Sequence, residues 1–87
     1  MKTKKEMNEL RRAEIAANIK KARESKGLSK AETARCAKMR YTTYDSYERG
    51  DREPNIDMVQ LIANALNVNW WELMGYKGWL VKIEYHT

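Results

Sequence analysis

A long helix is the first element that the apolar pattern predicts. Between Asn8 and Lys26 the chain has no Pro or Gly, and Ile15, Ile19 and Ala22 recur at the i, i+4, i+7 spacing of one helix face. We therefore expect a helix over about 8–26. Gly27 supplies the left-handed residue that commonly ends such a helix.

Two short helices are predicted next. Ser29, followed three positions later by Glu32, forms the sequence pattern of a capping box, which predicts a helix over about 30–37. After a short break, Tyr44 and Tyr47 fall on one face of a segment that Gly50 ends. This pattern predicts a third helix over about 41–49.

The second half of the chain predicts two more helices. Asn55 is placed to cap a helix that ends near Asn67, and its inward stripe consists of Ile56, Val59, Ile62, Ala63 and Leu66. Asn69 with Glu72 then forms a second capping-box pattern, and Gly75 follows as a stop signal. The fifth helix is therefore a short one.

The spacing of apolar residues changes after Gly78. Every second residue there is apolar or aromatic, which predicts a strand: Trp79, Val81, Ile83 and Tyr85. A single strand needs a partner, either the first residues of the chain or the same strand of a second copy. We favour the second copy. If the chain is part of a longer protein, the same segment could instead begin a linker.

Composition narrows the function classes. The chain has 87 residues and a net charge of +5, and residues 1–30 carry ten basic against four acidic side chains. Such a basic region is typical of proteins that meet polyanions. The chain has a single cysteine (Cys36), a single histidine (His86) and no glycine-rich phosphate loop. We therefore expect no metal site, no cofactor and no enzymatic activity. With no apolar run of about 20 residues, we expect a cytoplasmic protein.

Several linked motifs carry a family resemblance between Ile15 and Met74. They are Gly27-Leu28-Ser29, Ala34, Tyr47-Glu48-Arg49-Gly50, Pro54 and Ile62-Ala63-Asn64-Ala65-Leu66-Asn67-Val68. In these the chain resembles the phage-repressor (Cro/C1, XRE-like) family of helix-turn-helix proteins. The resemblance implies a mainly α fold, a five-helix repressor-like DNA-binding domain, here with a short carboxy-terminal β-strand.

The domain organisation follows from these elements. We expect a flexible basic tail over 1–7, the helix-turn-helix domain over 8–75 and the strand, as a dimerisation segment, within 76–87. The lysines of the tail could follow DNA or merely keep the protein soluble.

The resemblance also implies a structural ion pair between Arg23 and Glu48, which would tie the first helix to the end of the third. Two positions depart from the family. Lys38 stands where the turn often has Gly, which implies a left-handed non-Gly residue at a cost of about 1 kcal/mol. Thr33 replaces a large aliphatic residue, which implies a thinner core contact.

The third helix is the expected reading element, because a major groove about 12 Å wide admits one helix whose outer face is small or polar. The spacing predicts that Tyr41, Thr42, Asp45, Ser46 and Arg49 share that outer face. By resemblance, Tyr41, Thr42 and Ser46 match base-contacting positions, with Arg40 and Asp45 as additions. Asp45 could accept from a cytosine amino group or pair with Arg49, and the second is the more expected role.

The remaining candidate residues would contact DNA phosphates or a second copy of the chain. Lys30 and Thr43 match phosphate-contacting positions, and Ser29, Arg49 and Arg52 are further candidates. We expect the dimer interface to include Leu61, Trp71, Trp79, Val81, Ile83 and Tyr85.

The interpretation is therefore a sequence-specific regulator, a repressor that binds double-stranded DNA as a homodimer on a pseudo-palindromic operator. The alternative is an antitoxin or adaptor that uses the same fold to contact a toxin or another protein.

Overall fold

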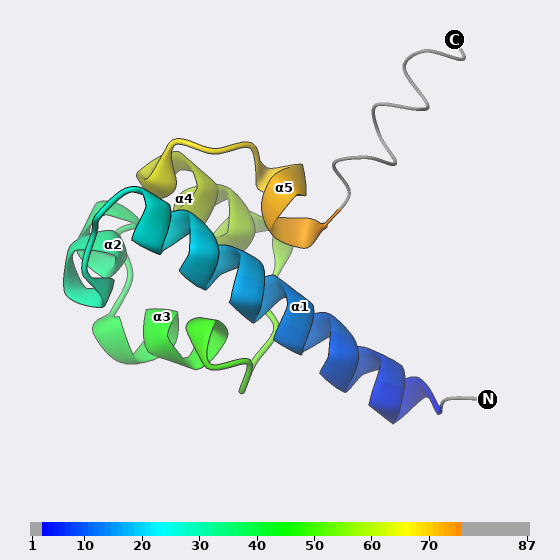
Figure 1. Cartoon of the computed structure of the whole chain (residues 1–87). Helices are drawn as coiled ribbons and strands as arrows, with labels where there is room; N and C mark the ends of the chain where they lie inside the picture. The colour runs from blue at the N-terminus through cyan, green and yellow to red at the C-terminus, as the bar shows by residue number, and fades with distance from the viewer. Residues whose placement is uncertain (1–2, 76–87) are drawn as a thin grey trace, which may run out of the picture.

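The computed structural model describes residues 3–75, and this part of the chain is helical (Figure 1). Its five helices are α1 (Lys4–Ser25), α2 (Lys30–Cys36), α3 (Tyr41–Glu48), α4 (Ile56–Leu66) and α5 (Trp70–Met74). The mainly α fold class is confirmed. The strand predicted after Gly78 lies outside the described residues.

Helix α1 begins at Lys4, so the start expected near Asn8 was four residues late. The reason is a capping box that the sequence reading overlooked: the Thr3 hydroxyl accepts from the Glu6 amide, and the Glu6 carboxylate accepts from the Thr3 amide. Lys4 to Met7 is thus helical rather than part of a flexible tail. In Figure 1 this end of α1 projects beyond the other helices.

Three other helices begin where their predicted caps stand, whereas α3 follows Arg40, whose side chain makes no capping bond. Ser29 and Glu32 form the capping box of α2, and Asn55 accepts from the Met58 amide at the start of α4. Asn69 and Glu72 form the box of α5. Local capping chemistry therefore specifies these starts.

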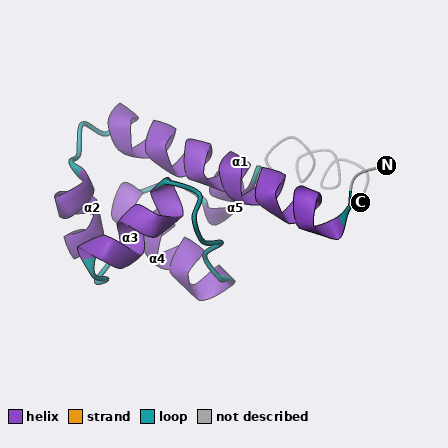
Figure 2. Ribbon diagram, turned by 90° about the horizontal axis from the view of Figure 1, so that it is seen from below, coloured by secondary structure: helices purple, strands orange, loops and turns teal. Residues whose placement is uncertain are grey.

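The core lies where α1 crosses the other helices, with α3 on one side and α5 on the other (Figures 1 and 2). It is built from buried apolar side chains of every described helix: Ile15, Ile19, Ala34, Ala37, Tyr44, Tyr47, Val59, Ile62, Ala63, Leu66 and Leu73. The Asn18 side chain donates to the Leu73 carbonyl (3.0 Å) and links α1 to α5. The carboxy-terminal half of α1 is therefore the support on which the domain packs.

The two departures from the family pattern are both accommodated. Lys38 adopts the left-handed conformation expected of it, with φ of 59°. Thr33 is fully buried, and its hydroxyl donates to the Ser29 carbonyl one turn earlier (2.9 Å). A polar residue can occupy this apolar position because its hydroxyl is hydrogen-bonded.

Helix α1 is the longest helix of the described part. Neither it nor any other helix there combines the length and apolarity that crossing a membrane requires.

Candidate nucleic-acid interface

Helices α2 and α3, joined by a tight turn at Lys38, form the candidate interface. Helix α3 is anchored through one face, where Tyr44 and Tyr47 are buried in the core. Gly50 ends the helix at φ of 78° and lies close to α1, since a Cβ there would be 3.6 Å from that of Ala16. The helix can therefore sit against α1 and still present its other face outward.

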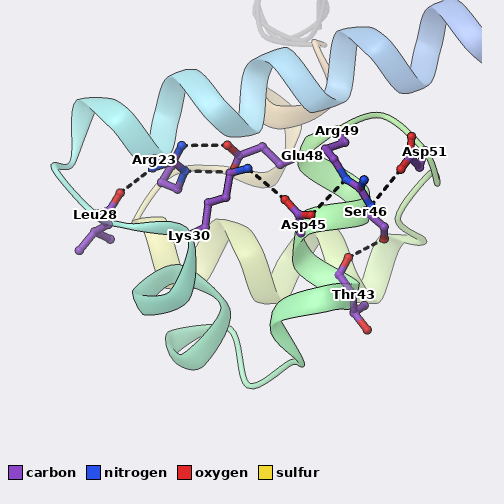
Figure 3. A network of polar contacts seen from close by, with 9 residues as sticks. All are labelled: Arg23, Leu28, Lys30, Thr43, Asp45, Ser46, Glu48, Arg49 and Asp51. Carbon is purple, nitrogen blue, oxygen red and sulfur yellow. Dashed lines mark hydrogen bonds and ion pairs between the residues drawn. The ribbon is translucent and has the colours of Figure 1, made fainter.

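A bidentate ion pair fixes the end of α3 to α1 (Figure 3). Arg23 donates from Nε to Glu48 Oε2 (2.9 Å) and from Nη2 to Glu48 Oε1 (2.8 Å). Its Nη1 donates to the Leu28 carbonyl (2.8 Å), in the loop before α2. The side chains are 12% and 2% exposed. One guanidinium thus connects α1, α3 and the loop that leads into α2.

The same contacts shift three pKa values. The hydrogen bond to Glu48 raises the pKa of Arg23. Burial alone would raise the pKa of Glu48, but the Arg23 guanidinium and the neighbouring Tyr44 hydroxyl outweigh it and lower that pKa. Burial, with the Glu48 carboxylate nearby, raises the pKa of Tyr44, whose hydroxyl has no well-aligned hydrogen bond within residues 3–75. At neutral pH the pair is charged and Tyr44 is neutral.

The outward face of α3 carries polar and aromatic side chains. Tyr41 is 49% exposed, Thr42 and Arg49 are exposed, and Asp45 is half-buried between them. Arg40 is the exposed residue just before the helix, and its side chain makes no capping bond. This face has the size and polarity that a major groove admits.

Asp45 is the centre of a second charged cluster, which joins α3 to α2 (Figure 3). Its Oδ1 lies 3.0 Å from Lys30 Nζ, and its Oδ2 lies 3.1 Å from Arg49 Nε. The hydrogen bond with Asp45 raises the pKa of Lys30. Arg49 also lies 3.1 Å from Asp51, through Nη2. The pairing of Asp45 with Arg49, the more expected of its two roles, is therefore present, and Lys30 shares it.

Ser46 does not lie on the outward face, and this expectation was wrong. It is 8% exposed, and its hydroxyl donates to the Thr43 carbonyl (2.7 Å). Its own carbonyl accepts from the amides of Asp51 and Arg52 (2.9 and 3.3 Å). The loop after α3 folds back over this side of the helix, so Ser46 organises the loop instead of reaching a base.

The phosphate candidates lie at the start of α2, on α3 and in the loop that follows α3. Lys30 is the first residue of α2, and Thr43 is half-buried on α3. Arg52 lies over the Tyr47 ring, with its Cζ 5.8 Å from the ring centroid. The capping box already occupies the amides of Ser29 and Glu32, so fewer free N–H groups remain at the α2 terminus than we expected.

Comparison with known proteins places this geometry in a family. The family model HTH_3, described as helix-turn-helix, matches residues 19–70. The chain belongs to the HTH_3 family. No curated protein matches it.

The fold of the HTH_3 domain also resembles that of a solved structure. The crystal structure of an HTH_3 family transcriptional regulator from Vibrio cholerae is similar, with 26% identity and a TM-score of 0.75. The likeness covers 84% of this chain and 41% of that one, so the chain spans less than half the length of that regulator.

Of the predicted dimer-interface residues, the structure describes Leu61 and Trp71. Leu61 is half-buried and packs against the core, and Trp71 is half-buried with its ring edge-on to Trp70 (centroids 5.8 Å apart). Leu61 is thus more engaged within its own domain than the sequence pattern indicated. Trp79, Val81, Ile83 and Tyr85 lie outside the described residues.

The sequence pattern did not indicate two features of the described residues. The contact between Lys30 and Asp45 spans 15 residues and two helices, so no local pattern could reveal it. Exposed Met7 and Leu10 line an open groove with Met74. Met7 was overlooked because the helix was expected to start after it. Within residues 3–75 no group of three or more His, Cys, Asp or Glu side chains could hold a metal ion.

Proposed function

We propose that this HTH_3 domain binds DNA sequence-specifically and serves as a transcriptional repressor. The observation that carries the proposal is the division of α3 into two faces. One face packs into the core through buried Tyr44 and Tyr47 and pairs with α1 through Glu48, and the other carries exposed Tyr41, Thr42 and Arg49 around half-buried Asp45. The likeness to a transcriptional regulator supports the same function.

In this proposal α3 enters the major groove with its amino-terminal end foremost. Tyr41 and Thr42 touch base edges, because they are exposed on the first turn of the helix. The methyl group of Thr42 suits a thymine methyl. Arg40 and Asp45 are the additional base-contacting candidates.

The phosphate contacts come from residues that border this face: Ser29, Lys30, Thr43, Arg49 and Arg52. They supply affinity and register, since a phosphate contact reads no base. Because Lys30 and Arg49 are both paired with Asp45 in the free domain, their contribution depends on how that carboxylate responds to DNA.

In vitro selection of bound DNA, followed by sequencing, tests this function. We expect an enriched pseudo-palindrome whose half-sites lie about 34 Å, or one helical turn, apart. A pool without any enriched sequence at moderate salt would refute sequence-specific binding. Enrichment of a single half-site would support base reading by α3 but refute binding as a homodimer.

The homodimer is a separate part of the proposal, supported by the alternating pattern at Trp79, Val81, Ile83 and Tyr85. Removing the residues after Gly78 should convert a dimer into a monomer, as measured by light scattering. The shortened chain retains every helix of the described part, so an unchanged mass would contradict this interface directly.

A further inference from the structure

Asp45 occupies an unusual place for a carboxylate on a surface that would face DNA. Its side chain is only 19% exposed, and each of its oxygens meets a different cation, one from α2 and one from its own helix. In Figure 3 Lys30 reaches across from α2 to one side of Asp45, and Arg49 approaches from the other. The carboxylate thus holds two proposed phosphate contacts in place.

The cluster is electrically balanced although the chain is basic. Lys30 and Arg49 face Asp45 and Asp51, whereas the whole chain carries a net charge of +5. A phosphate that binds Lys30 or Arg49 must compete with Asp45 for the same N–H donors. If the cations turn to phosphate, a carboxylate that is four-fifths buried is left without its partners beside a polyanion.

This cost applies to every DNA sequence, unless the duplex gives the carboxylate a new donor. In the major groove such donors are the exocyclic amino groups of cytosine and adenine. Asp45 is placed to meet one, because it stands one helical turn after exposed Tyr41 and one turn before exposed Arg49.

We propose that Asp45 is a specificity-determining residue: by pairing with Lys30 and Arg49 it suppresses binding to DNA that offers no amino group opposite it. The inference rests on the proposed function and adds a mechanism by which non-specific DNA is rejected. This role of Asp45 differs from an ordinary base contact, because it mainly weakens binding to DNA other than the target sequence.

Asp45→Asn tests the inference, since the amide keeps the shape of the side chain and removes its charge. Asp51→Asn is the matched control: it also removes one negative charge beside Arg49, but Asp51 is 55% exposed, follows α3 and does not touch Lys30. Fluorescence anisotropy would give the dissociation constants of the wild type and both variants. The probes are the duplex obtained by selection and a shuffled duplex of equal length, each measured over a range of salt.

For Asp45→Asn we expect tighter binding to the shuffled duplex and a salt slope steeper by about one to two units, because Lys30 is freed and Arg49 keeps only its contact with exposed Asp51. The ratio of specific to non-specific affinity should fall by about tenfold, which corresponds to the loss of one good base discrimination. Asp51→Asn should leave that ratio nearly unchanged.

The inference would be overturned if Asp45→Asn changed both affinities equally, or if Asp51→Asn lowered the ratio as much. A wild-type protein that selects no sequence would overturn the proposed function and this inference together. A selective wild type with an unchanged ratio in Asp45→Asn would leave the proposed function standing and remove only the inference.

Discussion

Two charged clusters involve side chains of α3, and they differ in almost every physical respect. The Arg23–Glu48 pair is bidentate and nearly excluded from water, whereas Lys30 and Arg49 approach Asp45 with one contact each from the surface. A buried pair is costly to break, because either partner alone is an uncompensated charge. A monodentate pair whose cation is partly exposed exchanges more easily with solvent or with another anion. The first therefore fixes the helix, and the second lies where a phosphate could compete.

The largest effect should come from breaking the buried pair. Arg23→Ala leaves Glu48 buried without its partner and also removes the donor to the Leu28 carbonyl, so we expect a loss of about 3 kcal/mol in the free energy of unfolding. Urea denaturation measures it.

Arg11→Ala provides the matched control, because Arg11 and Glu53 form a monodentate pair (3.3 Å) with side chains 50% and 35% exposed. This variant should lose less than about 1 kcal/mol. Equal losses for the two arginine variants would contradict the assignment of Arg23 as the structural residue.

The next effect concerns the two faces of α3. Thr42→Ala should weaken discrimination at one base position by about 1 to 3 kcal/mol and leave the stability nearly unchanged, because Thr42 is exposed. Competition binding with single-base variants of the selected duplex measures the discrimination.

Ser46→Ala is its counterpart on the same helix, since it also removes one hydroxyl. That hydroxyl is bonded to the Thr43 carbonyl, so its removal should affect stability, by about 1 kcal/mol, and not base preference. If Ser46→Ala relaxed the base preference and Thr42→Ala did not, the assignment of the two faces would be reversed.

Acid should weaken the Arg23–Glu48 pair. The pKa of Glu48 is lowered in the folded protein, so its contribution is present above the unfolded value, about 4.3, and is lost as the pH falls through the lower folded value. We expect the stability difference between the wild type and Glu48→Gln to shrink below about pH 4. Urea denaturation from pH 7 to pH 3 checks this, and a difference independent of pH would argue against an ionised Glu48.

Lys30→Ala should also have little effect on the fold. Its contact with Asp45 is partly buried, but Arg49 still pairs with that carboxylate, so thermal unfolding should change little, while binding to every duplex should weaken and the salt slope should fall by about one unit. Affinity measured against salt concentration is the test. A loss confined to one sequence would make Lys30 a base reader instead.

Much of the fold could be predicted because its signals are local. The starts of α2 and α5 depend on capping boxes within four residues, and the inward stripe of α4 recurs along the chain itself. The start of α1 was missed although Thr3 and Glu6 carry the same kind of signal. The lysines around Thr3 and Glu6 resemble a basic tail and obscure that signal.

The candidate site was harder to predict, because it depends on contacts distant in sequence. The helical spacing places Ser46 near the outward face, but only the tertiary structure shows the following loop folding back onto it. The link between Lys30 and Asp45 is also tertiary. The Arg23–Glu48 pair could be named beforehand only through the family resemblance, and the carboxy-terminal strand stays a prediction.

The central claim is that one face of α3 holds the helix while the other meets DNA. It is tested most directly by NMR spectra of the full chain, recorded with and without the selected duplex. We expect the largest shifts at Tyr41, Thr42 and Lys30, while the Arg23 Nε–H resonance, bonded to buried Glu48, keeps its position. Shifts centred on α4 and α5, with an unperturbed α3, would contradict the account.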